Sequence, residues 1–182
     1  MRIISGTHKG RRLQAPKNLP VRPTTDRAKE GLFNILAHRV YWPDTEVLDL
    51  FSGTGNIALE CASRGCASVT AVDAHPGCVS FIRKTAKALE LPVHPMRQDA
   101  LKYVDRVGRS FDLIFADPPY DLDPVAMKQL AARCTSPELL AEDGIFILEH
   151  GRQTDPSDWP GFTEQRVYGS SAFSFFERVA QP

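Results

Sequence analysis

The sequence lacks the long apolar runs, paired cysteines and strong charge excess that mark membrane, disulfide-bonded or disordered proteins. Its longest uninterrupted apolar runs, such as residues 145–148, span four residues, whereas a membrane-spanning helix needs about 20. The four cysteines show no C-x-x-C or cysteine–histidine spacing, which favours a reducing compartment over a disulfide framework or a zinc site. No apolar signal segment follows Met1. We therefore expect a cytoplasmic protein that holds no metal.

The composition is that of an ordinary globular protein, and the length suits one domain. The 182 residues are 42% hydrophobic and 24% charged, which excludes coiled-coil, collagen-like and disordered chains. A chain of this size buries roughly 70% of the surface that its extended form exposes, which is enough for a real core. We expect one domain with a small appendage.

The formal net charge of zero hides an uneven distribution. Residues 1–30 hold eight basic and two acidic residues, whereas the remainder of the chain holds fourteen basic and twenty acidic ones. Such a basic segment can be a solvated surface or a nucleic-acid-binding arm. The charge pattern alone favours neither of these two interpretations.

Strand and helix signals alternate along most of the chain. After two short N-terminal strands (1–4 and 11–13) and a proline-rich loop (15–23), a helix begins near Thr24, Thr25 or Asp26, which are all good N-caps. Further strands are predicted at 47–51, 68–72, 93–96, 111–116, 145–148, 162–168 and 172–179, and helices follow the strands that end at 51, 72, 96 and 116. This order predicts an α/β, Rossmann-like fold with a mostly parallel seven-stranded sheet, a C-terminal antiparallel hairpin and a small N-terminal β-hairpin extension.

Unusual residues follow four of the predicted strands, where parallel sheets bind their ligands. The segment from Asp49 to Gly55 passes from strand through a glycine turn into a helix, which lets backbone approach a ligand closely. Asp73 ends the next strand and can accept hydrogen bonds from ribose hydroxyls, and Asp99 can accept from an adenine amino group or cap the next helix. The predicted cofactor-binding residues are Asp49, Phe51, Ser52, Gly53, Thr54, Gly55, Asp73, Asp99 and Ala100.

Two cofactors fit this glycine turn. Gly53, Gly55 and Ala58 match the dinucleotide pattern G-x-G-x-x-G/A. However, Asp49 stands four residues before the first glycine, where its carboxylate would repel a diphosphate and attract a cofactor that carries an ammonium and a sulfonium. This favours S-adenosylmethionine, and the alternative for Asp49 is a structural carboxylate that caps loop N–H groups.

The tetrapeptide Asp117-Pro118-Pro119-Tyr120 follows the strand at 111–116 and supplies the candidate catalytic residues. Its two prolines restrict the backbone, so that a carboxylate, a carbonyl and an aromatic ring can meet one exocyclic amino group. The Asp117 side chain and the Pro118 carbonyl can accept the two amino hydrogens, while Tyr120 stacks on a flipped base. The alternative for this tetrapeptide is a plain β-turn. However, the tetrapeptide lies at the same edge of the sheet as the glycine turn, which favours a role in methyl transfer by positioning and electrostatics.

With these motifs, the chain resembles class I S-adenosylmethionine-dependent methyltransferases, and among them the RsmD family of bacterial enzymes. The resemblance spans nearly the whole chain, and its most specific part is the N-terminal arm combined with the aspartate tetrapeptide. The segments that carry it are 1–6, 10–13, 22–27, 32–34, 48–55, 63–65, 117–120, Glu149 and 168–169. Thr54, Asp73 and Cys66 depart from the usual family residues.

The resemblance implies methylation of the N2 atom of one guanine in 16S ribosomal RNA, within the 30S subunit. It gives the basic segment a role, so we expect residues 1–24 to form an RNA-binding arm and residues 25–182 the methyltransferase domain, acting as a monomer. Basic side chains would contact phosphates, which supply affinity without sequence choice. The predicted RNA-binding residues are Lys9, Arg11, Arg12, Arg22, Thr24 and Arg27.

Three other functions remain open at this point. An adenine-N6 DNA methyltransferase can carry the same tetrapeptide, but such enzymes need a target-recognition domain for which this chain has no room. A dehydrogenase would use the dinucleotide pattern, against which Asp49 argues. A non-catalytic RNA-binding assembly factor could retain the fold without the reaction.

Overall fold

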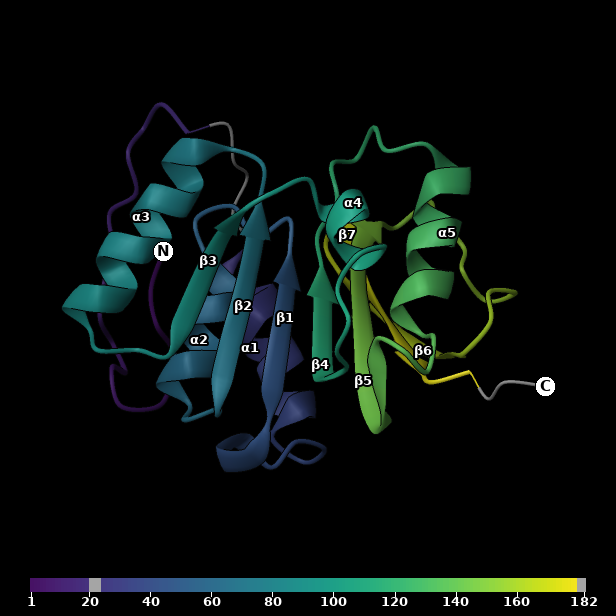
Figure 1. Ribbon diagram of the computed structural model, residues 1–182, viewed down its shortest axis with the longest axis horizontal. Coiled ribbons are helices and arrows are strands. Elements are labelled where there is room, and N and C mark those ends of the chain that lie inside the picture. The colour runs from purple at the N-terminus through teal and green to yellow at the C-terminus, as the bar shows by residue number, and fades with distance from the viewer. Residues whose placement is uncertain (20–23, 180–182) are drawn as a thin grey trace.

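A seven-stranded sheet forms the middle layer of the computed structural model, which describes residues 1–19 and 24–179 (Figure 1). The strand order is β3-β2-β1-β4-β5-β7-β6. The first five of these strands are parallel, and β7 lies antiparallel between β5 and β6. The strands are β1 (Glu46–Leu50), β2 (Ser68–Asp73), β3 (Val93–Arg97), β4 (Phe111–Ala116), β5 (Leu140–Gly151), β6 (Phe162–Tyr168) and β7 (Ser171–Glu177). The predicted sheet and its C-terminal hairpin are confirmed.

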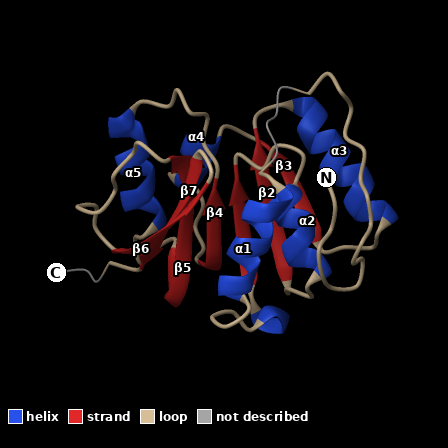
Figure 2. Ribbon diagram, turned by 180° about the vertical axis from the view of Figure 1, so that it is seen from behind, coloured by secondary structure: helices blue, strands red, loops and turns tan. Residues whose placement is uncertain are grey.

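Helices cover both faces of the sheet (Figure 2). One face carries α1 (Asp26–Leu36), α2 (Asn56–Ser63) and α3 (Pro76–Ala88), and the other carries α4 (Ala100–Val104) and α5 (Pro124–Cys134). A short 3-10 helix (Trp42–Asp44) leads into β1. In the part of the chain that the structure describes, no helix has the length and hydrophobicity to cross a membrane.

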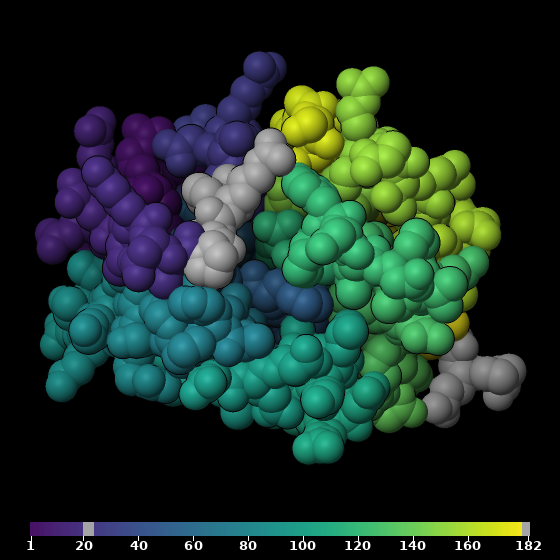
Figure 3. Space-filling model, turned by 90° about the horizontal axis from the view of Figure 1, so that it is seen from above, coloured from purple at the N-terminus to yellow at the C-terminus, as the bar shows by residue number. Residues whose placement is uncertain are grey.

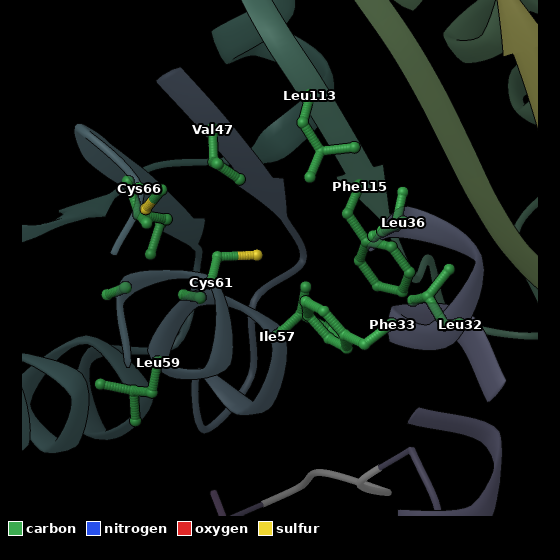
Figure 4. Packing of buried hydrophobic residues seen from close by; sticks show 14 of the residues in the cluster. Leu32, Phe33, Leu36, Val47, Ile57, Leu59, Cys61, Cys66, Leu113 and Phe115 are labelled. Atoms are coloured by element: carbon green, nitrogen blue, oxygen red, sulfur yellow. The ribbon is translucent and has the colours of Figure 1, made fainter. Parts of the chain in front are cut away.

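The period of two along the central strands sends their side chains into two separate cores. Leu113 and Phe115 of β4 join the core beneath α1–α3, whereas Ile114 joins the core beneath α4 and α5. Figure 4 shows the first core, in which Leu32 and Phe33 of α1 lie close to Phe115. Leu113 and Phe115 therefore face the same side of the sheet as α1, whereas Phe111, before the register shift between Phe111 and Leu113, packs in the other core.

Helices α1, α3, α4 and α5 begin at capping side chains, whereas α2 begins at Gly55 without one. Thr25 accepts a hydrogen bond from the backbone N–H of Ala28 at the start of α1, at 3.3 Å. Asp99 accepts one from Lys102 N–H at 2.9 Å and caps α4. Each bond satisfies a backbone donor that a helix N-terminus otherwise leaves without a partner. The predicted start of α1 among residues 24–26 is confirmed.

The N-terminal segment pairs as predicted but does not form regular strands. A single isolated bridge joins Arg2 and Arg12, supported by a hydrogen bond from Ile3 N–H to the Arg11 carbonyl at 2.9 Å. Two further backbone bonds join the segments, from Gly10 N–H to the Ile3 carbonyl at 2.8 Å and from Leu13 N–H to the Met1 carbonyl at 2.9 Å, whereas the next N–H groups along the chain, of Ile4 and Ser5, bond to Glu60 of α2. The predicted bounds of the later strands differ from the observed bounds by a few residues, and β5 is longer than the predicted 145–148.

A buried carboxylate anchors this N-terminal segment to the domain. The side chain of Glu60 on α2 is fully buried and accepts hydrogen bonds from the backbone N–H groups of Ile4, at 2.8 Å, and Ser5, at 3.0 Å. Lys29 of α1 lies 3.4 Å from the same carboxylate, and Arg64 donates to it at 2.9 Å. Burial lowers the pKa of Lys29, and the neighbouring charge of Glu60 opposes this change. The arm is thus a packed part of the fold.

We expect Lys29→Met to destabilise the protein by about 3 kcal/mol, because the variant leaves a buried carboxylate with one cation fewer. The double variant Lys29→Met/Glu60→Gln should recover much of that loss, since it removes the buried charge as well. Urea unfolding of both variants measures the effect. A double variant no more stable than the single one would contradict this account.

Candidate active site

A cleft of about 720 Å³ opens at the carboxyl edge of the sheet. Its walls come from the β1–α2 turn, the end of β2, the β4–α5 connection, the end of β5 and the β6–β7 turn. Figure 3 looks onto this edge and shows the N-terminal segment on one side, in purple, and the segment after β4 on the other, in green. Strands distant in sequence thus deliver their terminal residues to one place.

Asp49 of β1 supplies a buried carboxylate at the floor of the cleft. It is 2% exposed, and its Oδ2 atom accepts a hydrogen bond from the Ala58 N–H in the first turn of α2, at 3.0 Å. Burial and, to a smaller extent, the nearby charge of Asp73 raise the pKa of Asp49 to about 8, while the Ala58 bond opposes the change. The alternative interpretation expected Asp49 to cap loop N–H groups; the donor is instead an N–H of α2, and the same side chain lines the cleft.

The β1–α2 turn brings backbone donors to the second carboxylate. Asp73 accepts from Gly53 N–H and from His75 N–H, both at 2.8 Å, so both of its oxygen atoms are oriented by backbone. Gly53 and Gly55 have positive φ angles of 51° and 76°, and Phe51 shares this left-handed conformation at 56°. A Cβ atom on Gly55 would lie 2.9 Å from a carbon of Ile82. The turn therefore requires glycine for both conformation and packing.

The tetrapeptide at residues 117–120 forms the opposite wall. All four residues line the cleft. Pro118 is buried, whereas Tyr120 is 46% exposed. The Tyr120 hydroxyl is 2.8 Å from the Ser171 hydroxyl at the start of β7. This contact holds the tyrosine ring against the β6–β7 turn.

Thr24 and Glu149 complete the wall beneath α1. The Thr24 hydroxyl donates a hydrogen bond to Glu149 Oε2 at 2.9 Å, and the Thr24 carbonyl accepts one from the Asn56 amide at 3.1 Å. Lys29 in turn donates to Asn56 Oδ1 at 2.8 Å. The sequence predicted RNA binding for Thr24 and no role for Glu149, because no local pattern links two residues that lie 125 positions apart.

Tyr168 lies both in the core and at the cleft. Its ring packs against Phe173, with 5.6 Å between ring centroids, and against Gly31 of α1. A Cβ atom at Gly31 would lie 2.4 Å from atoms of this ring. The close contact joins α1 to the β6–β7 turn along one side of the cleft.

The structure brings together most of the predicted site residues but not all of them. Gly55 lies in the turn without lining the cleft, Asp99 is exposed where it caps α4, and Ala100 is buried beside it. Lys9, Arg11 and Arg12 are exposed on the N-terminal segment, outside the cleft, and Arg22 lies outside the described residues. The predicted residues that line the cleft are Thr24, Arg27, Asp49, Phe51, Ser52, Gly53, Thr54, Asp73 and 117–120. Lining residues that were given no role include Asn56, His75, Cys78 and Ser171.

The described residues contain no group of three or more histidine, cysteine, aspartate or glutamate side chains arranged to hold a metal ion. Within the same part of the chain, the four cysteines are all buried and unpaired with one another. Burial raises the pKa values of Cys66, to about 12, and of Cys78, to about 11. The polar chemistry of the cleft therefore comes from its carboxylates, amides and hydroxyls.

The strand order and the carboxylate-lined cleft define a class I S-adenosylmethionine-dependent methyltransferase, so the predicted fold and cofactor class are confirmed. The profile of the family described as "Conserved hypothetical protein 95" matches residues 1–177. The chain belongs to this family, which is the predicted RsmD family.

Relatives and solved structures agree with this assignment. The chain is 32% identical to the "Putative rRNA methyltransferase YlbH" of Bacillus subtilis, over 98% of this chain and 99% of that one. It is 28% identical to the "Ribosomal RNA small subunit methyltransferase D" of Escherichia coli K12, over 100% and 91%. The structure titled "Putative methyltransferase yhhF from Escherichia coli" matches with a TM-score of 0.84 and 26% identity, over 100% and 99%. A Thermus thermophilus 16S rRNA N2 G1207 methyltransferase, solved with AdoMet and guanosine, shares the fold at 21% identity and a TM-score of 0.69, over 88% of this chain and 45% of that one.

We expect Asp49→Asn to change how stability depends on pH. The pKa of Asp49 lies at about 8 in the folded protein and near 3.8 in an unfolded chain, so the folded state binds more protons between these values. Wild-type stability therefore falls through this group as pH rises from about 4 to about 8, and the variant lacks that fall. In urea unfolding from pH 5 to pH 9, the free energy of unfolding of the variant should rise relative to that of wild type until about pH 8.

The exposed Asp105→Asn substitution is the matched control, since it removes one carboxylate outside the cleft. A constant stability difference between Asp49→Asn and wild type across this pH range would show that Asp49 ionises at an ordinary acidic pH.

Proposed function

We propose that this protein transfers a methyl group from S-adenosylmethionine to the exocyclic N2 amino group of a specific guanine in 16S ribosomal RNA, within the assembled 30S subunit. The observation that carries the proposal is the placement of residues 117–120 on the same cleft as Asp49 and Asp73. The names of the relatives, which specify ribosomal RNA and its small subunit, support the choice of RNA.

The cleft fits the cofactor by charge. Asp49 lies where it can attract the ammonium and sulfonium groups, and it releases its proton when a cation arrives. Asp73 presents an oriented carboxylate to the ribose hydroxyls. The turn at 51–55 supplies further proposed contacts to the cofactor, and Asp99 and Ala100 are the proposed contacts to its adenine. One carboxylate oxygen of Asp99 accepts the capping hydrogen bond of α4.

The tetrapeptide acts on the base. The Asp117 carboxylate and the Pro118 carbonyl accept the two hydrogens of the amino group and turn its lone pair toward the methyl carbon. As the N–C bond forms, the C–S bond breaks in line with it and S-adenosylhomocysteine leaves. Asp117 then takes one proton from the methylated nitrogen, which is acidic only after transfer. Tyr120 stacks on the flipped base, with its hydroxyl fixed by Ser171.

The N-terminal segment supplies RNA affinity. Lys9, Arg11, Arg12 and Arg27 are exposed, so they are free to meet phosphates, whereas Lys29 and Arg2 are engaged by Glu60 and by Asp26 and Glu30. A second hollow, lined partly by Arg2 and Arg12, shares Thr24 and Thr25 with the cleft. This hollow offers a path for the RNA backbone from the segment to the active site.

The proposal keeps residues 1–24, with Arg22 among them, as the RNA-binding arm and residues 25–182 as the methyltransferase domain. Ile3 is buried and the N–H groups of Ile4 and Ser5 donate to Glu60, so the charges at residues 9–12 belong to a segment that is packed against the domain. A cytoplasmic monomer of this size can reach one base on the particle surface.

A labelled methyl-transfer assay tests the proposal. Purified protein is incubated with 30S particles, naked ribosomal RNA or DNA from cells that lack the enzyme, and the modified base is then mapped. We expect N2-methylguanine at one site of 16S RNA, formed fastest in the particle. Transfer to DNA adenine, or no transfer to any of the three, would overturn the proposal.

We expect Asp117→Ala to lower the transfer rate by roughly 10²- to 10³-fold, because the amino group loses an acceptor that positions it. Cofactor affinity, measured by calorimetry, should change little. Asp121→Ala is the matched control, because it removes an exposed carboxylate from the same connection. An active Asp117→Ala variant would contradict the mechanism.

We expect the triple variant Lys9→Gln/Arg11→Gln/Arg12→Gln to weaken RNA binding and to flatten its dependence on salt. Each lost phosphate contact should reduce the slope of log K against log salt by roughly 0.7–0.9. The matched control, Lys102→Gln/Arg106→Gln/Lys128→Gln, removes three exposed charges from α4, its C-terminal end and α5. Equal slopes in the two variants would show that the arm has no special role in binding.

A further inference from the structure

Glu149 is a buried carboxylate on the wall of the cleft, and no step of the proposed reaction involves it. It stands at the carboxyl end of β5 and is 4% exposed. A carboxylate is costly to bury and is retained where donors meet it. Because the side chain also lines the cleft, a bound substrate can present a further hydrogen-bond donor to it.

The sheet register places Glu149 beside Asp117. In the parallel pair of β4 and β5, Phe115 lies opposite Ile147 and Ala116 opposite Leu148. Continued by one residue past the end of β4, this register would set Asp117 opposite Glu149, at one strand spacing of about 4.8 Å, and both residues line the cleft. Phe115 and Ile147 face the core beneath α1. Because side chains alternate with a period of two, Asp117 and Glu149, two residues further along, are expected on that same side.

Thr24 fixes the orientation of Glu149. Its hydroxyl donates to Oε2 at 2.9 Å, and its carbonyl is held by Asn56, which Lys29 holds in turn. This chain of buried and partly buried hydrogen bonds reaches from α1 and α2 to the end of β5. The carboxylate is therefore held in one place rather than left to rotate in solvent.

Two neighbouring carboxylates match the hydrogen-bond donors of guanine. The Watson–Crick edge of guanine presents N1–H beside the N2 amino group, so adjacent acceptors can take one hydrogen from each. Adenine presents an acceptor at N1, which two carboxylates repel. Asp117 is assigned to the reacting amino group, and this leaves the neighbouring N1–H for Glu149.

We propose that Glu149, oriented by Thr24, selects guanine by accepting the hydrogen bond of its N1–H while Asp117 holds the N2 amino group. This inference deepens the proposed function and rests on it. Glu149 is a specificity-determining residue, and Thr24 is the residue that positions it.

The base analogue 2-aminopurine tests the proposal directly, because it keeps the exocyclic amino group at C2 but has an acceptor in place of N1–H. The 16S RNA substrate is rebuilt by ligation around a synthetic segment that carries guanine or 2-aminopurine at the mapped position. The ratio of the two methylation rates is then measured for wild type and for Glu149→Gln. A ratio within one preparation is independent of the fraction of folded protein.

We expect wild type to prefer guanine and the Glu149→Gln variant to lower that preference by about tenfold or more, because the glutamine amide can donate to the N1 acceptor of 2-aminopurine. Comparing the two proteins also cancels the effect of the missing O6 atom. Thr24→Val should lower the preference in part, and Thr24→Ser should restore it. Glu142→Gln, at an exposed position on the same strand, should leave it unchanged.

An unchanged preference in Glu149→Gln would overturn the inference while leaving the proposed function intact, provided that the mapped product is N2-methylguanine. A wild-type enzyme that methylates both substrates equally would overturn it as well. Methylation at another atom would instead overturn the proposed function.

Discussion

The buried Glu60 carboxylate links the three parts of the protein that stand around one side of the cleft. A charge removed from water needs donors on every side, and here they come from the arm, from Lys29 of α1 and from Arg64 at the end of α2. Moving any one of these parts would leave the charge exposed to apolar surroundings. Through Lys29 and Asn56, the same group of contacts sets the position of Thr24 at the cleft. The basic arm and the site are thereby built as one rigid unit.

The topology of the sheet concentrates negative charge at one edge. Asp49, Asp73, Asp117 and Glu149 end four strands that lie side by side in the order β2-β1-β4-β5. Burial of Asp49, with a smaller contribution from the charge of Asp73, raises the pKa of Asp49, so its ionisation opposes folding. Under the proposed function, a cationic cofactor and the amino hydrogens of a base would offset this cost. Lys9, Arg11 and Arg12 lie outside the cleft, so phosphates bound there would not approach the carboxylates.

The sequence was sufficient to predict the sheet, because β1 and β4 are apolar runs that end in conspicuous residues, and those residues indicate the ligand edge. It could not predict the contacts that cross the fold. Glu149 bonds to Thr24 and Lys29 pairs with Glu60 across long stretches of sequence, and no local pattern marks either pair. Lys29 was counted among the basic residues of the N-terminal segment, yet it is buried. Tyr168 likewise packs against the core and lines the cleft, and no local pattern indicates this double role.

The contact between Gly31 and the ring of Tyr168 ties α1 to the β6–β7 turn, so that side of the cleft cannot widen without separating packed surfaces. On this side the cleft is therefore bounded by packed side chains. Under the proposed function, the target nucleotide would have to leave its neighbours in the RNA before it enters. Unstacking of the RNA, rather than widening of this side of the protein, would then precede methyl transfer.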